Sequence, residues 1–237
     1  MDGAHGGVMS VEYSGAGVLE LMASAKNYNR FLADLVETAL RGSQTCVDFG
    51  AGDGTMTRLV AERGLRPACV EQDAGFRERL RAGGFDARAA LTDFAPGSIE
   101  GAYSLNVLEH IEDDLGALRA LRAAMAPGGR VLIYVPAFPV LFSAMDRLVG
   151  HVRRYRRAEL ATKLTAAGFV VERIAHADSL GFFAALAFRL LARGDGQPGE
   201  SSIVLYDRLA FPLSRLLDRV TGGLIGKNLF AVARVPS

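Results

Sequence analysis

Short apolar runs alternate with longer amphipathic stretches over most of the chain. Each run of the strand type is followed by a stretch of helical period or by a turn, and several of those stretches stop at glycine. The predicted strands cover residues 45–49, 66–72, 85–90, 100–106, 130–136, 170–177 and 228–235, and the predicted helices cover 55–64, 74–84, 112–129 and 157–169. This alternation predicts an α/β fold, an open and mostly parallel sheet with helices on both faces. Such sheets bind ligands beyond the carboxyl ends of their strands.

Two segments fall outside this alternation. Within residues 1–44, a helical pattern runs over 14–42, and we expect it to lie over the sheet edge or the ligand cleft. Residues 179–227 separate the sixth and seventh predicted strands, beginning with an apolar helix and a polar loop at 193–202. An amphipathic helix follows, which Pro212 should kink or split.

Composition narrows the class of protein. The chain has 237 residues, half of them hydrophobic, and a formal net charge of +1, so a nucleic-acid partner or a bulk membrane surface is not required. The first ten residues lack the pattern of a secretory signal, and the longest apolar run contains Arg189 and is too short to span a membrane. Cys46 and Cys69 form neither a disulfide framework nor a zinc site, so we expect a cytoplasmic protein with free thiols and no metal.

The turn between the first strand and the first helix, "VDFGAGDG" at 47–54, is the first candidate for ligand binding. Its glycines permit positive φ and close backbone approach, and the free N–H groups of the helix start attract negative charge. A phosphate-binding GxxxxGK[ST] sequence is absent, and Thr55 takes the place of the third glycine of a dinucleotide fingerprint.

Acidic residues around this turn indicate what it binds. Asp48 and Asp53 would repel a pyrophosphate but suit an ammonium or sulfonium group. Glu71 ends the second strand, where an acidic residue can accept both hydroxyls of a ribose. We therefore expect an adenosine-like nucleoside that carries positive charge.

That description matches S-adenosylmethionine (SAM), and the motifs resemble those of class I SAM-dependent methyltransferases. "VDFGAGDG" is similar to their first motif, "CVEQD" to the second, "LTDF" to the adenine-contacting segment, and "YSLNVLEHIEDD" and "APGGRVLIYVP" to the motifs of the fourth and fifth strands. The resemblance spans about residues 28–178 with all pieces in order. It implies a Rossmann-like sheet of seven strands with an antiparallel last strand.

The resemblance also implies the residues that bind the cofactor. Those positions are Tyr28, Asp48, Gly50, Ala51, Gly52, Glu71, Gln72, Asp93, Phe94, Asn106 and Val107. Structural roles would explain several of them as well: a turn aspartate for Asp48, a solvated strand end for Glu71, a helix N-cap for Asp93 and an amphipathic helix face for Tyr28. On the same grounds, one methyltransferase domain would fill residues 1–237, with an N-terminal helical cap (1–44), a SAM-binding core (45–178), a helical lid (179–227) and a last strand (228–235).

The acceptor side is less defined, because methyl transfer needs a general base only if the acceptor keeps its proton until attack. Candidate catalytic residues are His110, His151 and Tyr155, with Glu109 as a further candidate base. The cluster "HVRRYRR" at 151–157 is similar to a segment of relatives that methylate small molecules. It could hold an anionic acceptor group or form salt bridges to a neighbouring acidic face. The predicted substrate-binding residues are His110, Phe138, Phe142, His151, Arg153, Arg154 and Tyr155.

The expected function is methyl transfer from SAM, leaving S-adenosylhomocysteine, to a small hydrophobic acceptor. A natural-product, quinone, isoprenoid or lipid intermediate would fit, anionic or not, methylated on oxygen or carbon. An RNA or protein methyltransferase and a non-catalytic SAM-binding protein stay as alternatives, while Thr55 and Asp48 disfavour a nicotinamide oxidoreductase. The expected partner is a small molecule and no nucleic acid. The chain is expected to be a monomer or a homodimer, with peripheral membrane contact left open.

Overall fold

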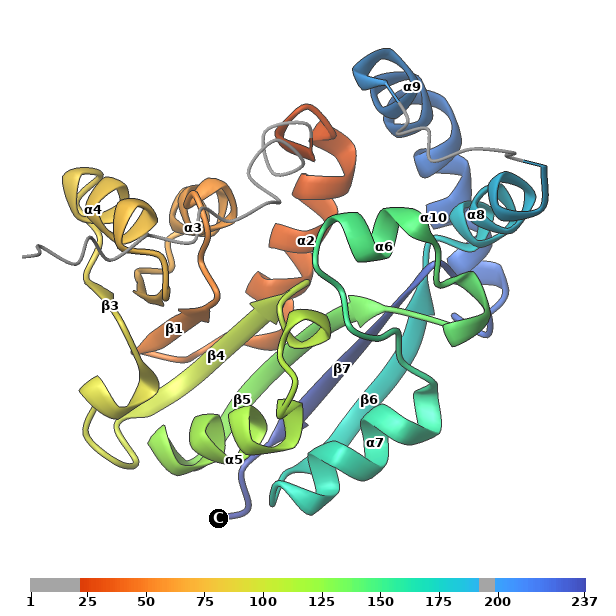
Figure 1. Ribbon diagram of the computed structural model, residues 1–237. Coiled ribbons are helices and arrows are strands. Elements are labelled where there is room, and N and C mark those ends of the chain that lie inside the picture. Colours follow the sequence, from red (N-terminus) through yellow and green to blue (C-terminus); the bar gives the residue numbers. More distant parts are fainter. Residues whose placement is uncertain (1–21, 192–198) are drawn as a thin grey trace, which may run out of the picture.

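A seven-stranded sheet forms the centre of the computed structural model, which describes residues 22–191 and 199–237 (Figure 1). The strand order is β3-β2-β1-β4-β5-β7-β6. The strands are β1 (Cys46–Phe49), β2 (Pro67–Val70), β3 (Ala87–Arg88), β4 (Ile99–Leu105), β5 (Met125–Pro136), β6 (Val170–Ala177) and β7 (Asn228–Arg234). Strands β1 to β5 pair in parallel, and β7 runs antiparallel to both β5 and β6. The predicted α/β sheet with an antiparallel last strand is confirmed.

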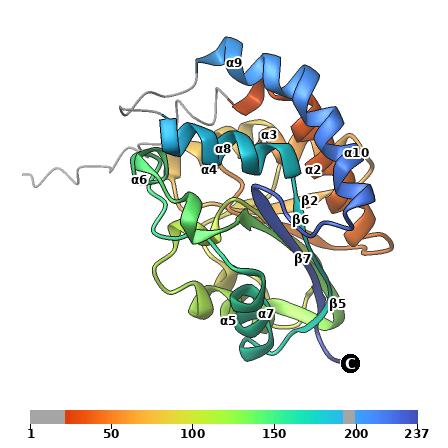
Figure 2. The same cartoon turned by 90° about the vertical axis from the view of Figure 1, so that its right-hand side faces the viewer.

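Helices cover both faces of the sheet (Figures 1 and 2). On one face lie α5 (Asp114–Ala124) and α7 (Arg157–Ala166), and on the other lie α2 (Lys26–Ala39), α3 (Thr55–Ala61) and α10 (Phe211–Val220). Helix α4 (Ala74–Ala82) packs beside β2 and β3.

Alternation along β5 shows why the sequence produces two cores. Val131 and Ile133 belong to the core beneath α5 and α7, whereas Leu132 and Tyr134 belong to the core beneath α2 and α10. All four side chains are fully buried, because successive residues of a strand point to opposite faces. Each buried large apolar side chain contributes roughly 1.5–3 kcal/mol of transfer free energy.

Unusual backbone conformations mark the carboxyl edge of the sheet. Among the described residues other than glycine, Asn106, Phe138 and Asp178 have positive φ values of 56°, 59° and 66°. Each lies one or two residues after the end of β4, β5 or β6. Such conformations cost about 1–3 kcal/mol each and gather where a chain must position functional groups. Short helices follow at this edge: η2 (Leu108–His110) after β4, and η3 (Pro139–Leu141) and α6 (Ala144–Leu148) after β5.

The described residues between β6 and β7 are mainly helical, and α10 with the turn before it lies beside α2 (Figure 2). It contains α8 (Ser179–Leu191), α9 (Glu200–Leu205), the π-helical turn η4 (Tyr206–Ala210) and α10. The π-turn ends two residues before Pro212 and interrupts the α-helical pattern there, but the backbone stays helical from Glu200 to Val220, so the helix is not split. Proline lacks the N–H that a regular α-helix needs at its position. The polar loop is shorter than expected, because residues 200–202 already belong to α9. Residues 193–198 of that loop lie outside the described residues.

Some boundaries also differ from the sequence prediction. Strand β3 is only two residues long, and α5 ends at Ala124 rather than continuing to 129. Pro127 explains the early end, since the residue before a proline is disfavoured in helical conformation. The segment 125–129 instead opens β5. Of the predicted N-terminal helical pattern, residues 14–21 lie outside the described part. Over the described ranges, the helices are too short or too polar to cross a bilayer.

Candidate functional site

The glycine turn lies at the carboxyl end of β1, in the middle of the sheet. Gly50, Gly52 and Gly54 have φ values of 88°, 54° and 79°, a region that disfavours residues with a side chain. The N–H groups of Gly50 and Ala51 donate to the Val70 carbonyl at 2.8 and 3.2 Å. A Cβ atom on Gly50 would lie only 2.4 Å from Cγ2 of Val107. Gly50 therefore allows the turn to pack directly against the segment after β4.

Glu71 links this turn to β2. Its Oε2 accepts a hydrogen bond from the Gly52 N–H at 2.8 Å, and its Oε1 accepts one from the Asp73 N–H at 2.8 Å. The carboxylate is half-buried and lies beside the glycine turn, at the strand end predicted to bind a ribose. The neighbouring Gln72 is exposed.

Asp48 lies beneath the turn and is 3 % exposed. Its Oδ2 accepts hydrogen bonds from the Thr57 hydroxyl at 2.7 Å and the Tyr103 hydroxyl at 2.9 Å. Burial raises the pKa of Asp48 to about 7, although the two hydroxyl donors act in the opposite direction. Asp48 thus braces the turn from below and places a titratable carboxyl under the expected cofactor.

Asp93 and Phe94 occupy the turn after β3. Oδ2 of Asp93 accepts hydrogen bonds from the N–H groups of Ala89 and Ala90 at 3.2 and 3.1 Å, which caps the short helix η1 (Leu91–Asp93). The Phe94 ring is half-buried, with the Arg88 guanidinium 4.1 Å from its centroid. Both residues therefore have structural partners, and their contact with adenine stays a prediction.

Tyr28, Asn106 and Val107 come together where α2 crosses the ends of β4 and β5. Burial raises the pKa of Tyr28 to about 12, and a hydrogen bond with the Asn106 side chain partly opposes it. The Tyr28 ring also packs edge-on against Tyr134 and Phe211, at centroid distances of 6.2 and 5.5 Å. The structure thus places Tyr28 beside the segment expected to face the sulfonium end of the cofactor.

A cluster of titratable residues lies next to that segment. Glu109 and His110 end η2, and His151 follows α6. The rings of His110 and His151 meet edge to face with centroids 4.7 Å apart, and His151 Nε2 lies 3.8 Å from Oε1 of Glu109. Burial raises the pKa of Glu109 to about 8 and lowers that of His110 to about 4. Two of the three predicted catalytic residues are therefore neighbours.

The third, Tyr155, is placed differently. Its side chain is fully buried, and its hydroxyl contacts the Leu108 carbonyl at 3.1 Å and Oδ2 of Asp114 at 2.7 Å. Burial raises its pKa far above the usual range, with the hydrogen-bonded Asp114 adding to the effect. This geometry favours a structural role, so we do not include Tyr155 among the residues of the proposed acceptor site.

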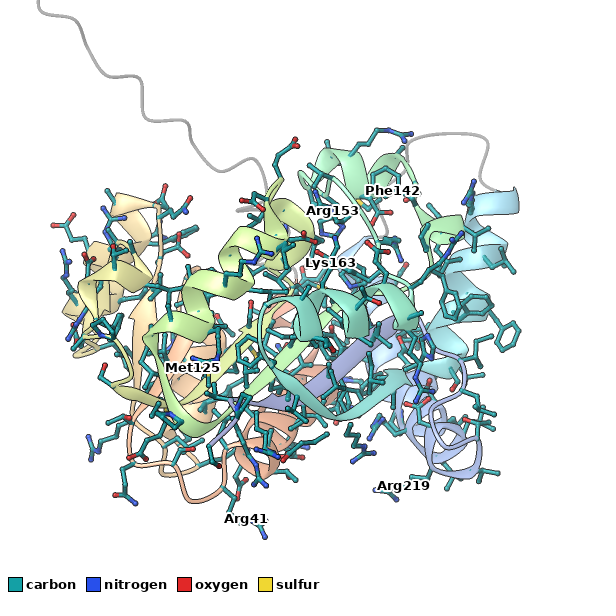
Figure 3. The ribbon with its side chains drawn as sticks, turned by 90° about the horizontal axis from the view of Figure 1, so that it is seen from below. Arg41, Met125, Phe142, Arg153, Lys163 and Arg219 are labelled. Carbon is teal, nitrogen blue, oxygen red and sulfur yellow. The ribbon has the colours of Figure 1, made fainter. Side chains whose placement is uncertain are left out.

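Two of the four arginines of the 151–157 cluster, Arg153 and Arg154, are already paired. Arg153 lies 2.8 Å from Asp114, which also pairs with Lys163, and the two cations lie on the same side of the molecule (Figure 3). Arg154 forms a two-pronged contact with Asp146, with Nε and Nη2 at 2.8 and 3.0 Å from its oxygens. The salt-bridge alternative thus describes both arginines in this structure.

The two predicted aromatic residues of the acceptor site have different surroundings. Phe138 stacks on His176 with ring centroids 4.7 Å apart and planes within 11°, and Phe182 packs edge-on against it at 5.0 Å. Phe142 instead has the Arg147 guanidinium 5.7 Å from its centroid. Two surface hollows, along α6 and along α9, contain none of the predicted site residues. The ring contacts therefore favour Phe138 over Phe142 as an aromatic residue of the acceptor site. Neither surface hollow marks that site.

Sequence reasoning missed three members of this edge. Asp146 fixes His151 through Nδ1 at 2.8 Å, His176 stacks on Phe138, and Asp207 accepts hydrogen bonds from the first N–H groups of α2. Asp146 lies only five positions before His151 and follows Ser143 in a helix-capping pattern, a signal that could have been noticed. The other two are joined to their partners only by the tertiary fold.

Comparisons with known proteins agree with this geometry. A family described as a methyltransferase domain matches residues 24–174. An uncharacterized methyltransferase of Mycobacterium sp. (strain JLS) is 32 % identical over 121 residues, and the match spans 47 % of each chain, so this chain covers about half of that relative's length.

Solved structures are similar in fold at low identity. Geranyl diphosphate C-methyltransferase from Streptomyces coelicolor A3(2), in complex with Mg²⁺, geranyl diphosphate and S-adenosylhomocysteine, is 17 % identical with a TM-score of 0.63, over 97 % of this chain and 84 % of that one. A chain from the complex between the Haloferax volcanii Trm112 methyltransferase activator and a methyltransferase is 16 % identical with a TM-score of 0.60, over 95 % of this chain and 98 % of that one.

The family match covers more than half of the chain, and the residues that it spans include the glycine turn, Asp48 and Glu71. The chain belongs to the SAM-dependent methyltransferase family, with S-adenosylmethionine as its cofactor.

Proposed function

We propose that this protein transfers a methyl group from SAM to oxygen or carbon of a small hydrophobic acceptor. The observation that carries the proposal is the packing of Gly50 against Val107. This contact places the expected donor turn beside the segment that bears Glu109 and His110. Donor and acceptor chemistry would then meet at one point of the carboxyl edge, as a group transfer requires.

The donor residues have separate tasks in this proposal. SAM supplies an electrophilic methyl group on a positively charged sulfur. Glu71 would accept the ribose hydroxyls, and Asp48 would place negative charge beneath the turn. Tyr28 would cover the methionine end from α2, since its ring lies over Tyr134 and its hydroxyl is near Asn106. Such cover excludes water, which would otherwise weaken the electrostatic interactions of the site.

The acceptor class rests on the aromatic group formed by Phe138, His176 and Phe182. The Phe138 ring contacts the other two rings at the carboxyl edge, and such an aromatic group suits a flat or apolar molecule. The similar geranyl diphosphate C-methyltransferase acts on an isoprenoid diphosphate, which supports an acceptor of the isoprenoid, quinone, lipid or natural-product type. Because ion pairs already occupy Arg153 and Arg154, we do not base the proposal on an anionic group of the acceptor.

A donor titration tests the first half of the proposal. Calorimetric titration with S-adenosylhomocysteine should give one site per chain in the wild type and at least tenfold weaker binding in Glu71→Gln. Glu78→Gln, an exposed carboxylate of α4, serves as the matched control and should bind as the wild type does. No binding by folded wild-type protein would refute the assigned donor site.

A second assay tests the acceptor class. Transfer of labelled methyl from SAM is measured with phenolic, isoprenoid and fatty-acyl compounds, and with RNA and protein substrates in parallel. The proposal expects product only from the hydrophobic small molecules, with Phe138→Ala raising KM. Labelled RNA or protein would favour the alternative methyltransferase classes, and tight donor binding with no product from any substrate would favour a non-catalytic SAM-binding protein.

The helices between β6 and β7 support delivery of the acceptor from a lipid surface. Along α9, η4 and α10 the polar residues Asp207, Ser214 and Asp218 are buried, whereas most of the large apolar residues face outward and only Phe211 among them is buried. The exposed apolar stripe consists of Leu205, Leu209, Leu213, Leu216 and Val220, each 56–80 % exposed. Exposed Arg208 and Arg219 lie within the same helices, and Arg219 stands at the edge of the molecule (Figure 3).

We infer that this apolar stripe rests on an anionic lipid bilayer. Apolar side chains flanked by arginines give a helix affinity for anionic membrane surfaces. Vesicles containing phosphatidylglycerol should sediment the wild type but not the variant Leu209→Gln/Leu216→Gln. The variant Val140→Gln/Leu148→Gln, with exposed apolar residues elsewhere, is the control. If the wild type does not bind vesicles but forms a dimer, and the stripe variant is a monomer, then the stripe binds a second copy of the chain and not a membrane.

A further inference from the structure

Glu109 is buried in a way that calls for a partner. Its side chain is 0 % exposed, and neither carboxylate oxygen has a hydrogen-bond partner among the described residues. Burying an unpaired carboxyl group costs several kcal/mol unless a proton, a cation or a metal compensates it. Its backbone carbonyl is satisfied by the Val152 N–H at 2.8 Å, so the unmet requirement belongs to the side chain alone.

Two histidines face the same carboxylate. One ligand atom each from Glu109, His110 and His151 lies within 4.8 Å of the other two. His110 comes from η2, directly after β4, and its ring hydrogen-bonds to the Gly150 backbone. His151 follows on the loop after α6. Two segments of the carboxyl edge thus bring the three groups together.

The ring of His151 is held in the orientation that a metal ligand needs. Its Nδ1 lies 2.8 Å from Oδ1 of Asp146, an aspartate that also accepts from Arg154 and Ser143. A carboxylate so placed fixes Nδ1 as the donor, which leaves the lone pair on Nε2. That nitrogen lies 3.8 Å from Oε1 of Glu109. A carboxylate behind a histidine is the usual support of a metal-binding imidazole.

We propose that Glu109, His110 and His151 bind one divalent transition-metal ion of the Zn²⁺ type, oriented by Asp146. Two imidazoles and one carboxylate form the ligand set of catalytic zinc sites and of open iron sites. Ligands at about 2.1 Å from a tetrahedral ion are roughly 3.4 Å apart, so separations of up to 4.8 Å would have to shorten by at most about 1.4 Å to close the site. The expectation of no metal rested on the two cysteines, but the proposed ligand set contains no cysteine.

Three protein ligands leave at least one position of the ion open. Resting on the proposed function, that position would take the acceptor oxygen, in a site only two residues beyond Val107. The bound hydroxyl would release its proton to solvent, and its oxygen lone pair would form the bond to the methyl carbon. The electrons of the broken carbon–sulfur bond stay on sulfur, which leaves the neutral thioether. The ion would thus replace a general base and favour oxygen as the methylated atom.

The competing explanation is a protonated Glu109 in a site without metal. The two explanations differ in measurable metal binding. Tag-free protein stripped with a chelator is titrated with Co²⁺, whose visible absorption reports imidazole and carboxylate coordination. We expect one ion per chain, displaced stoichiometrically by Zn²⁺, and at least 100-fold weaker binding in Glu109→Gln. Asp146→Asn should weaken binding by about 10–100-fold, as loss of a supporting carboxylate does.

Controls separate a lost site from a lost fold. Glu112→Gln removes an exposed carboxylate three positions away and should bind Co²⁺ as the wild type does. His110→Gln, at a partly exposed position, gives the same comparison if Glu109→Gln does not fold. Wild-type protein that binds Co²⁺ no better than these ligand variants overturns the proposal. Binding of S-adenosylhomocysteine is measured on the same stripped protein, so failure of the metal site is distinguished from failure of the donor site.

Discussion

Replacing Gly50 by alanine tests how closely the donor turn is packed against the acceptor segment. The added Cβ would lie 2.4 and 2.7 Å from the two γ-carbons of Val107, at a backbone φ of 88°. Left-handed backbone costs a residue with a side chain about 1–2 kcal/mol. Overpacking adds about 1–3 kcal/mol. The expected loss of unfolding free energy is therefore about 2–5 kcal/mol, a large part of the stability of a typical domain.

Gly42 offers a matched control within the same chain. It has a φ of 91°, yet a Cβ there would have no neighbour within 4 Å. Gly42→Ala should therefore lose only the backbone part, about 1–2 kcal/mol. The difference between the two variants, measured by urea unfolding, isolates the contact with Val107.

The double variant Gly50→Ala/Val107→Ala completes the test. Removing the two γ-carbons should restore about 1–3 kcal/mol of the Gly50→Ala loss, beyond what the single Val107→Ala variant predicts by addition. Affinity for S-adenosylhomocysteine should recover in parallel. Equal losses in Gly50→Ala and Gly42→Ala, or strict additivity in the double variant, would refute the claim that the turn rests on Val107.

Three further perturbations probe the edge from other sides. Because burial raises the pKa of Asp48 to about 7, above its unfolded value, the stabilising effect of its proton is complete at acid pH and is lost as pH rises through 7. The unfolding free energy of Asp48→Asn, measured in urea, should therefore rise relative to that of the wild type by on the order of 2–3 kcal/mol as the pH increases from about 5 to about 8. A difference that does not change with pH would contradict the assignment. Asp207→Ala removes the acceptor of two backbone N–H groups at the start of α2 and should cost about 1–3 kcal/mol, with weaker binding of S-adenosylhomocysteine; unchanged thermal unfolding would argue against it. Tyr155→Phe leaves Asp114 without one donor and should cost about 1–3 kcal/mol while kcat per folded molecule stays unchanged; a collapse of kcat alone would restore Tyr155 as a catalytic residue.

The fold was predictable because its signals are local. The central strand β5 contains a continuous apolar run at 131–136, and the turn at 50–54 is recognisable by its three glycines. The weak segment 85–90 yields only the two-residue β3, in keeping with its single large apolar residue, Phe85. Boundaries failed where two signals competed, as at Pro127, which ended a helix that periodicity alone would continue.

Pairings between distant residues were beyond sequence reasoning. Arg153 pairs with Asp114 and Arg154 pairs with Asp146. These contacts form only because the segments that follow β4 and β5 meet the segment before α7 at one edge of the sheet. A cluster of arginines looks the same in sequence whether it binds an anion of the substrate or an aspartate of its own chain. The same limitation applies to α10, where a period of apolar residues normally marks the buried side.

In α10 the reverse arrangement has a physical cause. Asp178 has a positive φ at the end of β6, and its carboxylate accepts hydrogen bonds from the Tyr206 and Ser214 hydroxyls at 2.6 and 2.8 Å. Asp218 accepts from the N–H groups of Asp178 and Ser179, both at 3.0 Å. Donors at the strand end thus hold the polar side of α10 inward.

The leucines on the opposite side of α10 therefore face the solvent. A hydrogen-bonded interface between α10 and the end of β6 is energetically less favourable to form than one packed with leucines. Such an arrangement is expected where the exposed leucines serve in binding. Continuous apolar surface of this kind marks an interaction site in a folded protein. The buried aspartates and the exposed stripe are therefore two sides of one arrangement, and loss of the Asp178–Ser214 contact should disturb both the helix position and binding to lipid vesicles.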